Sequence, residues 1–393
     1  MYTLQDGGGN QTLVANQSGT NNQGQVTQGA VPNPLTFPPK GHDQARSVAG
    51  SMDNNATLGQ SGADGIAQIV QAGSGSLATI DQSGTSNETR IFQQENSEGN
   101  TATSTQTGND ANSNISQFGS GNEGTVTQND GSDSNVEQGN FDDQSSGNTA
   151  TVNQNAGSSR SVSDINQNGS DNETNVTQSG ANNDSFAYTT GDSNKVGLTQ
   201  SGAKNASVII QRGFVTGATA TGNKATVSQI GSDTNNQLRQ DGLRNTANVT
   251  LSGTGRSEPR QTDSAGYTEN VPPESDIIQI GEVNQATVDQ AADRSRVTIY
   301  QGVDRSSGDL LLADNSRNNS ATTTQTASAD DSRSDTYQGG SDNIADVNQS
   351  GVSNLSEIDQ LGTRNIANVN QSTAGNRSSV NQNGTSNVAN VRQ

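Results

Sequence analysis

The chain has 393 residues, of which 26% are hydrophobic and 3% are aromatic, and it contains no Cys and no Trp. This composition excludes a conventional globular core, disulfides and thiolate metal sites, because there is too little apolar surface and no sulfur ligand. The formal net charge of −20 argues against a nucleic-acid partner, since phosphate binding requires clustered Lys and Arg. No apolar run is long enough to span a membrane as a helix.

Short units that close on Gln recur from the start of the chain to its end. A weak unit is expected first, with Tyr2, Leu4 and Asp6 in register, and 29 clearer units follow, 27 of which end in Gln. Of the 28 spacings between closing residues, 19 are 11 residues. A disordered chain rich in Asn and Gln is the alternative, but it would not show such position-specific repetition. The repeat therefore favours an ordered fold with a thin core.

Three segments interrupt the repeat, at residues 29–53, 252–272 and 302–318. All seven prolines lie in these segments or at their edges. Insertions in repeat folds emerge at turns as surface loops. We therefore expect a single β-solenoid domain over residues 1–393, with three surface insertions that decorate it or, alternatively, bind a partner.

The unit that closes at Gln349 shows the pattern within a repeat. Asn343, Ala345, Val347 and Gln349 alternate with other residues, and a Ser-Gly turn follows. Across the chain, 24 of the 29 units carry Val, Ile or Leu two residues before the closing position. Alternation with period two is typical of a strand and not of a helix. Glycine supplies the positive φ that a tight turn needs.

The first position of the unit alternates between Asn and another small residue through much of the chain, as at Asn122, Ser132 and Asn148. Two kinds of strand therefore take turns, and the repeating coil has 22 residues. Stacking about 15 such coils predicts an all-β solenoid of two parallel, in-register sheets, with Asn and Gln ladders between rungs. The predicted ladder and core residues are Gln117, Gly119, Asn122, Val126, Gln128, Asn343, Ala345, Val347, Gln349, Asn354, Ile358, Gln360, Asn365, Ala367, Val369 and Gln371.

The pattern resembles the curlin repeat of bacterial functional amyloids of the curli type, Ser-x5-Gln-x-Gly-x-Gly-Asn-x-Ala-x3-Gln. The segment "QFGSGNEGTVTQ" carries Gln117, Gly119, Gly121, Asn122 and Gln128 at the matching places, and "GNKATVSQ" at 222–229 matches the second half. This chain has many more units than the five-repeat members of the family, and the second Gly is often replaced. The resemblance implies a fibre-forming subunit, a nucleator subunit as partner, and export through an outer-membrane pore with chaperones.

Both ends of the repeat are expected to be open for polymerisation. Asn387, Ala389, Val391 and Gln393 fill the four inward positions of the last unit, and Tyr2 and Leu4 begin the first. Uncapped parallel edges are templates for strand addition, which gives a head-to-tail contact that does not close. The sequence thus predicts a homopolymer.

The sequence offers no catalytic, cofactor or metal site. His42 is the only histidine and lies in the first insertion, where a solvated loop residue is the expected role. The acidic pairs Asp142-Asp143 and Asp330-Asp331 lack the spacing of a calcium loop and are interpreted as solvating groups. No combination of nucleophile, base and acid can be drawn, so an enzyme is not expected.

The predicted function is that of a secreted structural subunit that assembles into extracellular fibres of a biofilm or adhesive matrix. The segment "MYTLQDGGGN" lacks a signal peptide, so the sequence is interpreted as a mature, exported form. One alternative is a monomeric β-solenoid that acts as an adhesin or an ice-binding module. Another is the nucleating minor subunit of the same fibre.

Overall fold

A computed structural model describes residues 2–5, 10–28, 30–33, 44–47, 52–94, 97–139, 145–212, 220–254, 275–304, 311–312 and 316–393. None of these residues lies in a helix, and most lie in strands. The chain divides into two compact units, Met1–Asn183 and Asp184–Gln393. The prediction of an all-β fold is confirmed.

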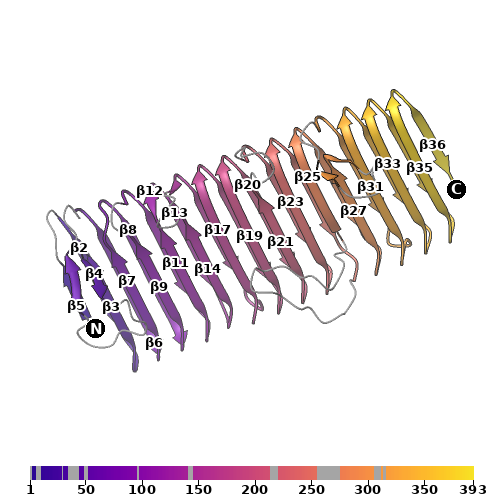
Figure 1. Cartoon of the computed structure of the whole chain (residues 1–393). Helices are drawn as coiled ribbons and strands as arrows, with labels where there is room; N and C mark the ends of the chain where they lie inside the picture. Colours follow the sequence, from indigo (N-terminus) through magenta and orange to yellow (C-terminus); the bar gives the residue numbers. More distant parts are fainter. Residues whose placement is uncertain are drawn as a thin grey trace. The chain divides into compact units, whose positions relative to one another are not determined.

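The first unit contains two parallel sheets (Figure 1). The first sheet has the order β1 (Tyr2–Gln5), β3 (Gln23–Gln28), β7 (Ile66–Gln71), β9 (Glu88–Gln93), β11 (Asn112–Gln117), β14 (Asp133–Gln138) and β17 (Val162–Ser170). The second has the order β2 (Thr12–Gln17), β6 (Asn55–Ala63), β8 (Leu77–Thr85), β10 (Thr101–Gln106), β13 (Glu123–Gln128), β16 (Thr149–Gln154) and β18 (Glu173–Ser179). Short strands β12 (Gly119–Ser120) and β15 (Ser145–Ser146) extend the first sheet at one corner.

The second unit repeats this arrangement. Its first sheet has the order β19 (Asp184–Asp192), β21 (Ala206–Gln211), β23 (Asn235–Leu243), β25 (Ser275–Glu282), β27 (Arg296–Gln301), β31 (Arg333–Ser341), β33 (Leu355–Thr363) and β35 (Arg377–Thr385). Its second has the order β20 (Lys195–Ser201), β22 (Lys224–Gln229), β24 (Thr246–Leu251), β26 (Gln285–Gln290), β30 (Ser320–Gln325), β32 (Ile344–Gln349), β34 (Ile366–Gln371) and β36 (Val388–Arg392).

Within each unit the chain alternates between the two sheets, so that two strands make one coil. Ile344 pairs with Ile366, and Gln349 pairs with Gln371, each 22 residues further on. The prediction of a 22-residue coil and in-register parallel sheets is therefore confirmed. Equal spacing places like residues on top of one another, because the side-chain period of a strand is two.

The interior of each unit is one residue layer deep on either side. In β32 the inward residues Ala345, Val347 and Gln349 are buried, while the intervening Ile344 and Asp346 are exposed. Branched aliphatic side chains occupy the middle of the layer in most coils, and short Ala side chains lie beside them. Because so little apolar surface is buried per residue, the backbone and amide ladders must supply much of the order.

Corners such as the one after Gln360 contain two backbone positions with positive φ, Gly362 and Arg364, and they differ in how much space surrounds them. At the first, Gly362 has φ +117°, and an added Cβ would lie 2.1 Å from the carbonyl oxygen of Gly384 in the next coil. At the second, Ser353 and Arg364 both have φ +57°. An equivalent glycine that has a coil on either side, Gly99, would place its Cβ in open space. At the corner after Gln360 the first position therefore has no room for a side chain, whereas the second accepts one.

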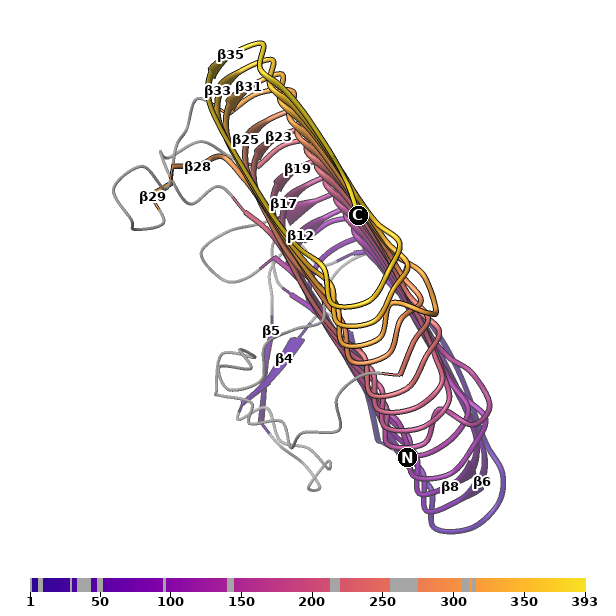
Figure 2. The ribbon, with the colours of Figure 1, turned by 90° about the vertical axis from the view of Figure 1, so that its right-hand side faces the viewer.

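The insertions are described only in part. In the first, β4 (Ala30–Asn33) and β5 (Gln44–Ser47) form an antiparallel hairpin, and β4 contacts β3 and β7 of the first sheet. In the third, β28 (Val303–Asp304) pairs with β29 (Leu311–Leu312). Figure 2 shows both pairs beside the stacked strands rather than among them. His42, in the first insertion, and the acidic pair Asp142-Asp143, between the units that close at Gln138 and Gln154, lie outside the described residues.

The register predicted for the opening unit is corrected by one residue. Gln5, and not Asp6, aligns with Gln28, so that Tyr2 and Leu4 align with Gln25 and Thr27. A shift of one residue exchanges the two faces of a strand. Tyr2 and Leu4 therefore do not share the register of the inward positions of β3, and alignment of Gln with Gln takes precedence over the apolar pattern.

Candidate functional site: amide ladders and edge strands

The closing Gln residues form continuous hydrogen-bonded ladders. In the second sheet of the second unit, the Nε2 of Gln349 donates to the Oε1 of Gln371 at 2.9 Å, and Gln371 donates to Gln393 at 3.1 Å. In the first sheet, Gln360 donates to Gln382 at 2.8 Å. Every bond runs from the Nε2 of one coil to the Oε1 of the next coil along the chain.

The first unit has the same ladders. Gln117 donates to Gln138 at 2.9 Å, and Gln128 donates to Gln154 at 2.8 Å. Along the same ladder Gln106 donates to Gln128 at 2.9 Å. The Gln128 carboxamide thus accepts from one neighbouring coil and donates to the other, which offsets the cost of burying it.

Each Gln also ties one sheet to the other. The Nε2 of Gln360, on β33, donates to the carbonyl oxygen of Ile344 on β32 at 2.9 Å. Gln349, on β32, donates to the carbonyl oxygen of Arg333 on β31 at 3.0 Å. The amide therefore closes the coil laterally and links it to the next rung at the same time. This double role explains why Gln occupies 27 of 29 closing positions.

The Asn residues at the first position of each unit form a second ladder, in which side-chain oxygens accept hydrogen bonds from both side-chain amides and backbone N–H groups. The Oδ1 of Asn343 accepts the backbone N–H of Asn365 at 3.0 Å and its Nδ2–H at 3.1 Å. Asn365 is bonded in the same way to Asn387, at 3.2 and 3.0 Å. In the other sheet, the Oδ1 of Asn354 accepts the N–H of Asn376 at 2.9 Å. The side-chain oxygen thus fixes the first backbone group of the following coil.

The structure buries every residue that was predicted for the ladder and the core. Asn343, Val347, Gln349, Ile358, Gln360, Asn365, Ala367, Gln371, Gln117 and Val126 have no exposed surface or almost none, and Ala345, Asn354, Val369, Asn122 and Gln128 are at most 2% exposed. Gly119 is also buried, but it lies at a corner rather than in a ladder, with φ +93°.

The ladders are interrupted where the repeat lacks its Gln, with Thr189 stacked on Gln211 in one sheet and Leu251 stacked on Gln290 in the other. Leu251 stands between Gln229 and Gln290 in the second sheet of the second unit. Within the described part of the chain, the buried Oε1 of Gln290 has no hydrogen-bond partner. An unpaired buried acceptor costs about 1–3 kcal/mol, so this interruption is a local weak point.

The edge strands β2 and β36 expose side chains at the inward positions, whereas the internal coils bury the side chains at these positions. In β36, Ala389 and Val391 are half-buried, Asn387 and Gln393 are exposed, and Val388 is 63% exposed. In β2, Leu13 and Ala15 are also half-buried. Among the described strands β36 pairs only with β34, and β35 only with β33.

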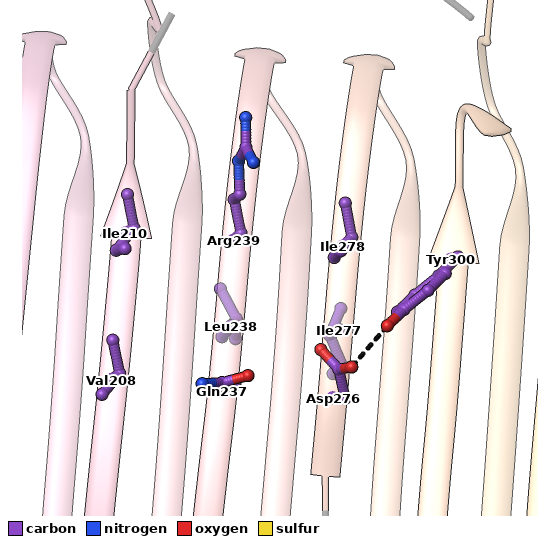
Figure 3. Close-up of a pocket in the computed structure, with 9 residues that line it drawn as sticks. All are labelled: Val208, Ile210, Gln237, Leu238, Arg239, Asp276, Ile277, Ile278 and Tyr300. Atoms are coloured by element: carbon purple, nitrogen blue, oxygen red, sulfur yellow. Dashed lines mark hydrogen bonds between the residues drawn. The ribbon is translucent and has the colours of Figure 1, made fainter. Parts of the chain in front are cut away.

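A cavity on the outer face of the second unit was not predicted. It has a volume of about 160 Å³ and lies over β21, β23, β25 and β27 (Figure 3). Val208, Ile210 and Ile278 line it from outward positions, which the sequence pattern assigns to polar residues. The hydroxyl of Tyr300 donates to a carboxylate oxygen of Asp276 at 2.5 Å on its wall. The repeat pattern alone could not locate this cavity, because the outward residues that line it follow no repeat.

Partly buried carboxyl groups on the outer faces have raised pKa values. Burial raises the pKa of Asp276, although the hydrogen bond from Tyr300 and the charge of Arg296 oppose this shift. Burial and the Asp276 carboxylate together raise the pKa of Tyr300 above its usual range. In the first unit, burial raises the pKa of Asp164, which accepts a hydrogen bond from Asn135 at 3.0 Å.

The acidic pair Asp330-Asp331 is engaged by a neighbouring coil. Asp331 accepts two hydrogen bonds from the guanidinium of Arg294, at 2.9 and 3.0 Å, and Asp330 accepts the N–H of Asp293 at 3.0 Å. Over the ranges that the structure describes, no cluster of acidic or His side chains has the geometry of a metal site. Those ranges also contain no helix long and apolar enough to cross a membrane.

Comparison with known protein families identifies one segment of the chain. Residues 169–202 match the model of the curlin-associated repeat. The matched segment begins at the corner residue Gly169 and includes the buried Asn172 and Gln178, which are the positions that carry the pattern elsewhere in the chain. No curated protein sequence matches the chain. Residues 169–202 thus form a curlin-associated repeat, and the resemblance of this chain to the curlin-repeat family is confirmed.

Proposed function

We propose that this chain is a structural subunit of an extracellular amyloid-type fibre that grows head-to-tail by strand addition. The observation that supports the proposal most strongly is the equivalence of the rungs. Ala345, Ala367 and Ala389 pair in register, as do Val347, Val369 and Val391. A rung from another copy would find the same partners that the last rung offers to its own chain.

The edge at β35 and β36 carries the chemistry that an added rung needs. Internal coils bury Val369 to 2% exposure, whereas Val391 stays half-buried at the edge. The Nε2 of Gln371 donates to Gln393, and the same direction would have Gln393 donate to the first closing Gln of the next copy. Parallel edges that are not covered pair readily with a further chain.

The net charge of −20 fits a thin fibre rather than a bundle. Like charges on neighbouring fibres repel one another, and salt screens this repulsion over roughly 10 Å. Ladder contacts along the axis are buried and are screened much less. Growth along the axis is thereby favoured over lateral association.

Seeded elongation tests the proposal. Chain that is diluted from denaturant should lengthen pre-formed seeds, and the rate should rise with chain concentration. Val391→Lys, which places a charge at an inward position of the edge, should stop elongation, because an unpaired buried charge is costly. Asn390→Lys adds the same charge at the exposed neighbouring position and serves as the control. Equal elongation by the two variants, or no elongation by the unaltered chain, would contradict the proposal.

The family resemblance extends the proposal to the location and partners of the chain. Curlin-repeat subunits act outside the cell, so we propose export through an outer-membrane pore with chaperones, and a nucleator subunit that starts the fibre. Antibody labelling of intact cells tests the location. Loss of surface signal without loss of total protein, after deletion of the pore, would support the route.

A monomeric binding module is the second candidate, and one observation favours it. Thr79, Thr103, Thr125 and Thr151 stack in register on the outer face of the first unit's second sheet. A regular row of hydroxyl and methyl groups is the kind of surface that an ice-binding face requires. Inhibition of ice recrystallisation by a chain that stays monomeric would favour this candidate over the fibre subunit.

A further inference from the structure

The cavity over β21, β23, β25 and β27 has aliphatic side chains on both sides of its middle strand. Ile210 and Ile278 lie in register on either side of Arg239, and Val208 lies in register with Gln237. All five residues occupy outward positions and line the cavity. Ile210 is only 6% exposed, although it lies on the outer face. The outer face of this sheet therefore offers apolar surface on either side of β23.

An ion pair keeps the space above β23 open. Arg239 has a side chain long enough to cover its neighbours, but it extends along β23 and away from Gln237 (Figure 3). Its Nε and a terminal nitrogen both donate to one carboxylate oxygen of Asp241, at 2.9 and 2.6 Å. Because Asp241 is only 2% exposed, this pair is shielded from solvent. The hollow that remains measures about 160 Å³, and an apolar cavity of roughly 150 Å³ can hold one benzene ring.

One wall of the cavity presents a carboxylate with hydrogen-bonding capacity left. Asp276 accepts from the hydroxyl of Tyr300 through one oxygen at 2.5 Å, and its other oxygen lies on the side of β23 (Figure 3). The Gln237 carboxamide lies across the floor and makes no hydrogen bond within the part of the chain that the structure describes. Among the described residues that line the cavity, Arg239 carries the only positive charge, and that charge is already paired. A ligand therefore meets acceptor oxygens but no free cation.

We propose that this cavity binds a small organic cation that joins one apolar ring to an amidinium or ammonium group. The ring would lie between Ile210 and Ile278, and its charged N–H group would donate to the free oxygen of Asp276. A hydrogen bond whose donor and acceptor are ionised is about twice as strong as a neutral one. The site does not depend on the proposed function, because it needs no second copy of the chain.

Other classes of ligand fit the cavity less well. An anion would be repelled by Asp276 and by the net charge of −20. A neutral apolar molecule would cover the free oxygen of Asp276 without supplying a donor, and an unpaired buried acceptor is costly. The charge of Arg296 acts on Asp276, but the Nε of Arg296 has no hydrogen-bond partner within the described chain. A cationic N–H group is therefore the complement of this wall.

Titration of the full chain with benzamidine tests the proposal, and benzamide, which has the same ring without the charge, is the matched ligand. We expect benzamidine to bind in a ratio of one to one with a Kd of about 1 mM or below. Benzamide should bind about tenfold more weakly or worse. In methyl NMR spectra, benzamidine should shift the signals of Ile210 and Ile278. It should not shift the signal of Ile344, which is 44% exposed on the other sheet.

Two variants test the role of the Asp276 charge. Asp276→Asn keeps the size of the side chain and an oxygen that can accept from Tyr300, and it should weaken the binding of benzamidine about tenfold or more. Asp346→Asn removes the same charge at an exposed position of β32 and should leave the affinity unchanged.

Three results would overturn the proposal. Equal affinities for benzamidine and benzamide would show that the cavity selects an apolar ring and not a cation. Benzamidine binding that does not saturate at about ten times the expected Kd, or that shifts Ile344 as much as Ile278, would show that the cavity is not a specific site. Equal affinities of Asp276→Asn and Asp346→Asn would show that Asp276 does not hold the charged group. The methyl shifts of the unaltered chain decide the location even if Asp276→Asn does not fold, and absence of fibres would leave all these outcomes unchanged.

Discussion

Glycine at the first corner position is required by space as well as by φ. Gly362 supports the backbone of the next coil, and its φ of +117° lies outside the left-handed helical region that Asn, Asp or Ser tolerate. The second corner position has φ near +57° and is occupied by Ser353, Arg364 and Asp342 among others. Strain at that position is modest for polar residues, and a Cβ added at the equivalent Gly99 meets no atom within 4 Å.

The first prediction concerns this difference. Gly362→Ala should lower the free energy of unfolding by about 3 kcal/mol, from backbone strain and the clash with the carbonyl oxygen of Gly384. Gly375→Ala, at an uncrowded corner, should lower it by about 1 kcal/mol or less. Urea denaturation of the non-assembled chain measures both. Equal losses in the two variants would contradict the steric explanation.

Val283 is the one β-branched residue among the described positions with positive φ, which is +57° there. A branched Cβ is poorly tolerated in the left-handed region, at a cost of about 1–2 kcal/mol. Val283→Asn should therefore raise the free energy of unfolding by about 1 kcal/mol. Val352→Asn, at an exposed turn position, should change it little. Thermal denaturation of both variants checks this, and destabilisation by Val283→Asn would contradict it.

At the scale of the element, the ladder that Leu251 interrupts offers a test of the amide network. Gln at 251 could accept from Gln229 and donate to the unpaired Oε1 of Gln290. A buried Leu is normally a poor site for Gln, because the amide loses its hydration. The ladder removes this penalty only at the closing position.

We predict that Leu251→Gln leaves the free energy of unfolding within about 1 kcal/mol of the original value. Leu238→Gln should lower it by about 2–4 kcal/mol, since Leu238 is equally buried but lies two residues before a closing position. Urea denaturation curves for the two variants provide the comparison. A loss of several kcal/mol in Leu251→Gln would show that the ladder does not compensate the amide.

Much of the element pattern could be predicted from the sequence. The 11-residue spacing and the alternation at Asn343, Ala345 and Val347 specify strands, their pairing and their inward faces, because each rung repeats the one before it. Outward features could not be predicted in this way. The cavity beside Tyr300 and the row of Asn114, Asn135 and Asp164 join coils that the insertions and turns separate by variable lengths, and their residues follow no repeat.

The register of the opening unit shows where the pattern misleads. Tyr2 and Leu4 are the most apolar residues of that segment, so a hydrophobic pattern places them with the inward positions. The backbone pairing of Gln5 with Gln28 shifts them by one. In a fold whose core is this thin, the pairing of closing Gln residues is a better guide to register than hydrophobicity.

At the scale of the whole molecule, partly buried carboxyl groups make the free energy of unfolding depend on pH. Burial raises the pKa values of Asp164, Asp241 and Asp276 in the folded chain. As the pH falls from neutral, these groups bind protons in the folded state before they do so in the unfolded state, where an Asp titrates near 3.8. Stability should therefore increase on mild acidification, and the smaller net charge acts in the same direction.

Asp164→Asn tests this explanation. The variant should be more stable than the original chain at pH 7, because it buries no charge and keeps an acceptor for Asn135. Its advantage should shrink as the pH falls, because the raised pKa lets the original Asp164 bind a proton in the folded chain before it does so in the unfolded chain. Asp81→Asn, at an exposed position, removes the same charge and is the control. The midpoints of urea denaturation at pH 7 and pH 5 are compared for both variants and the original chain. A stability gain of Asp164→Asn that does not depend on pH would contradict the explanation.

The central claim is that one set of ladder contacts joins coils within a chain and then chains within a fibre. Cryo-electron microscopy of the chain, refolded by dilution from denaturant, tests it most directly. The account predicts unbranched fibres with an unbroken axial repeat of about 4.8 Å, in which β1 and β2 of one copy pair with β35 and β36 of the next. Separate particles that never join, or fibres held together by lateral contacts, would contradict it.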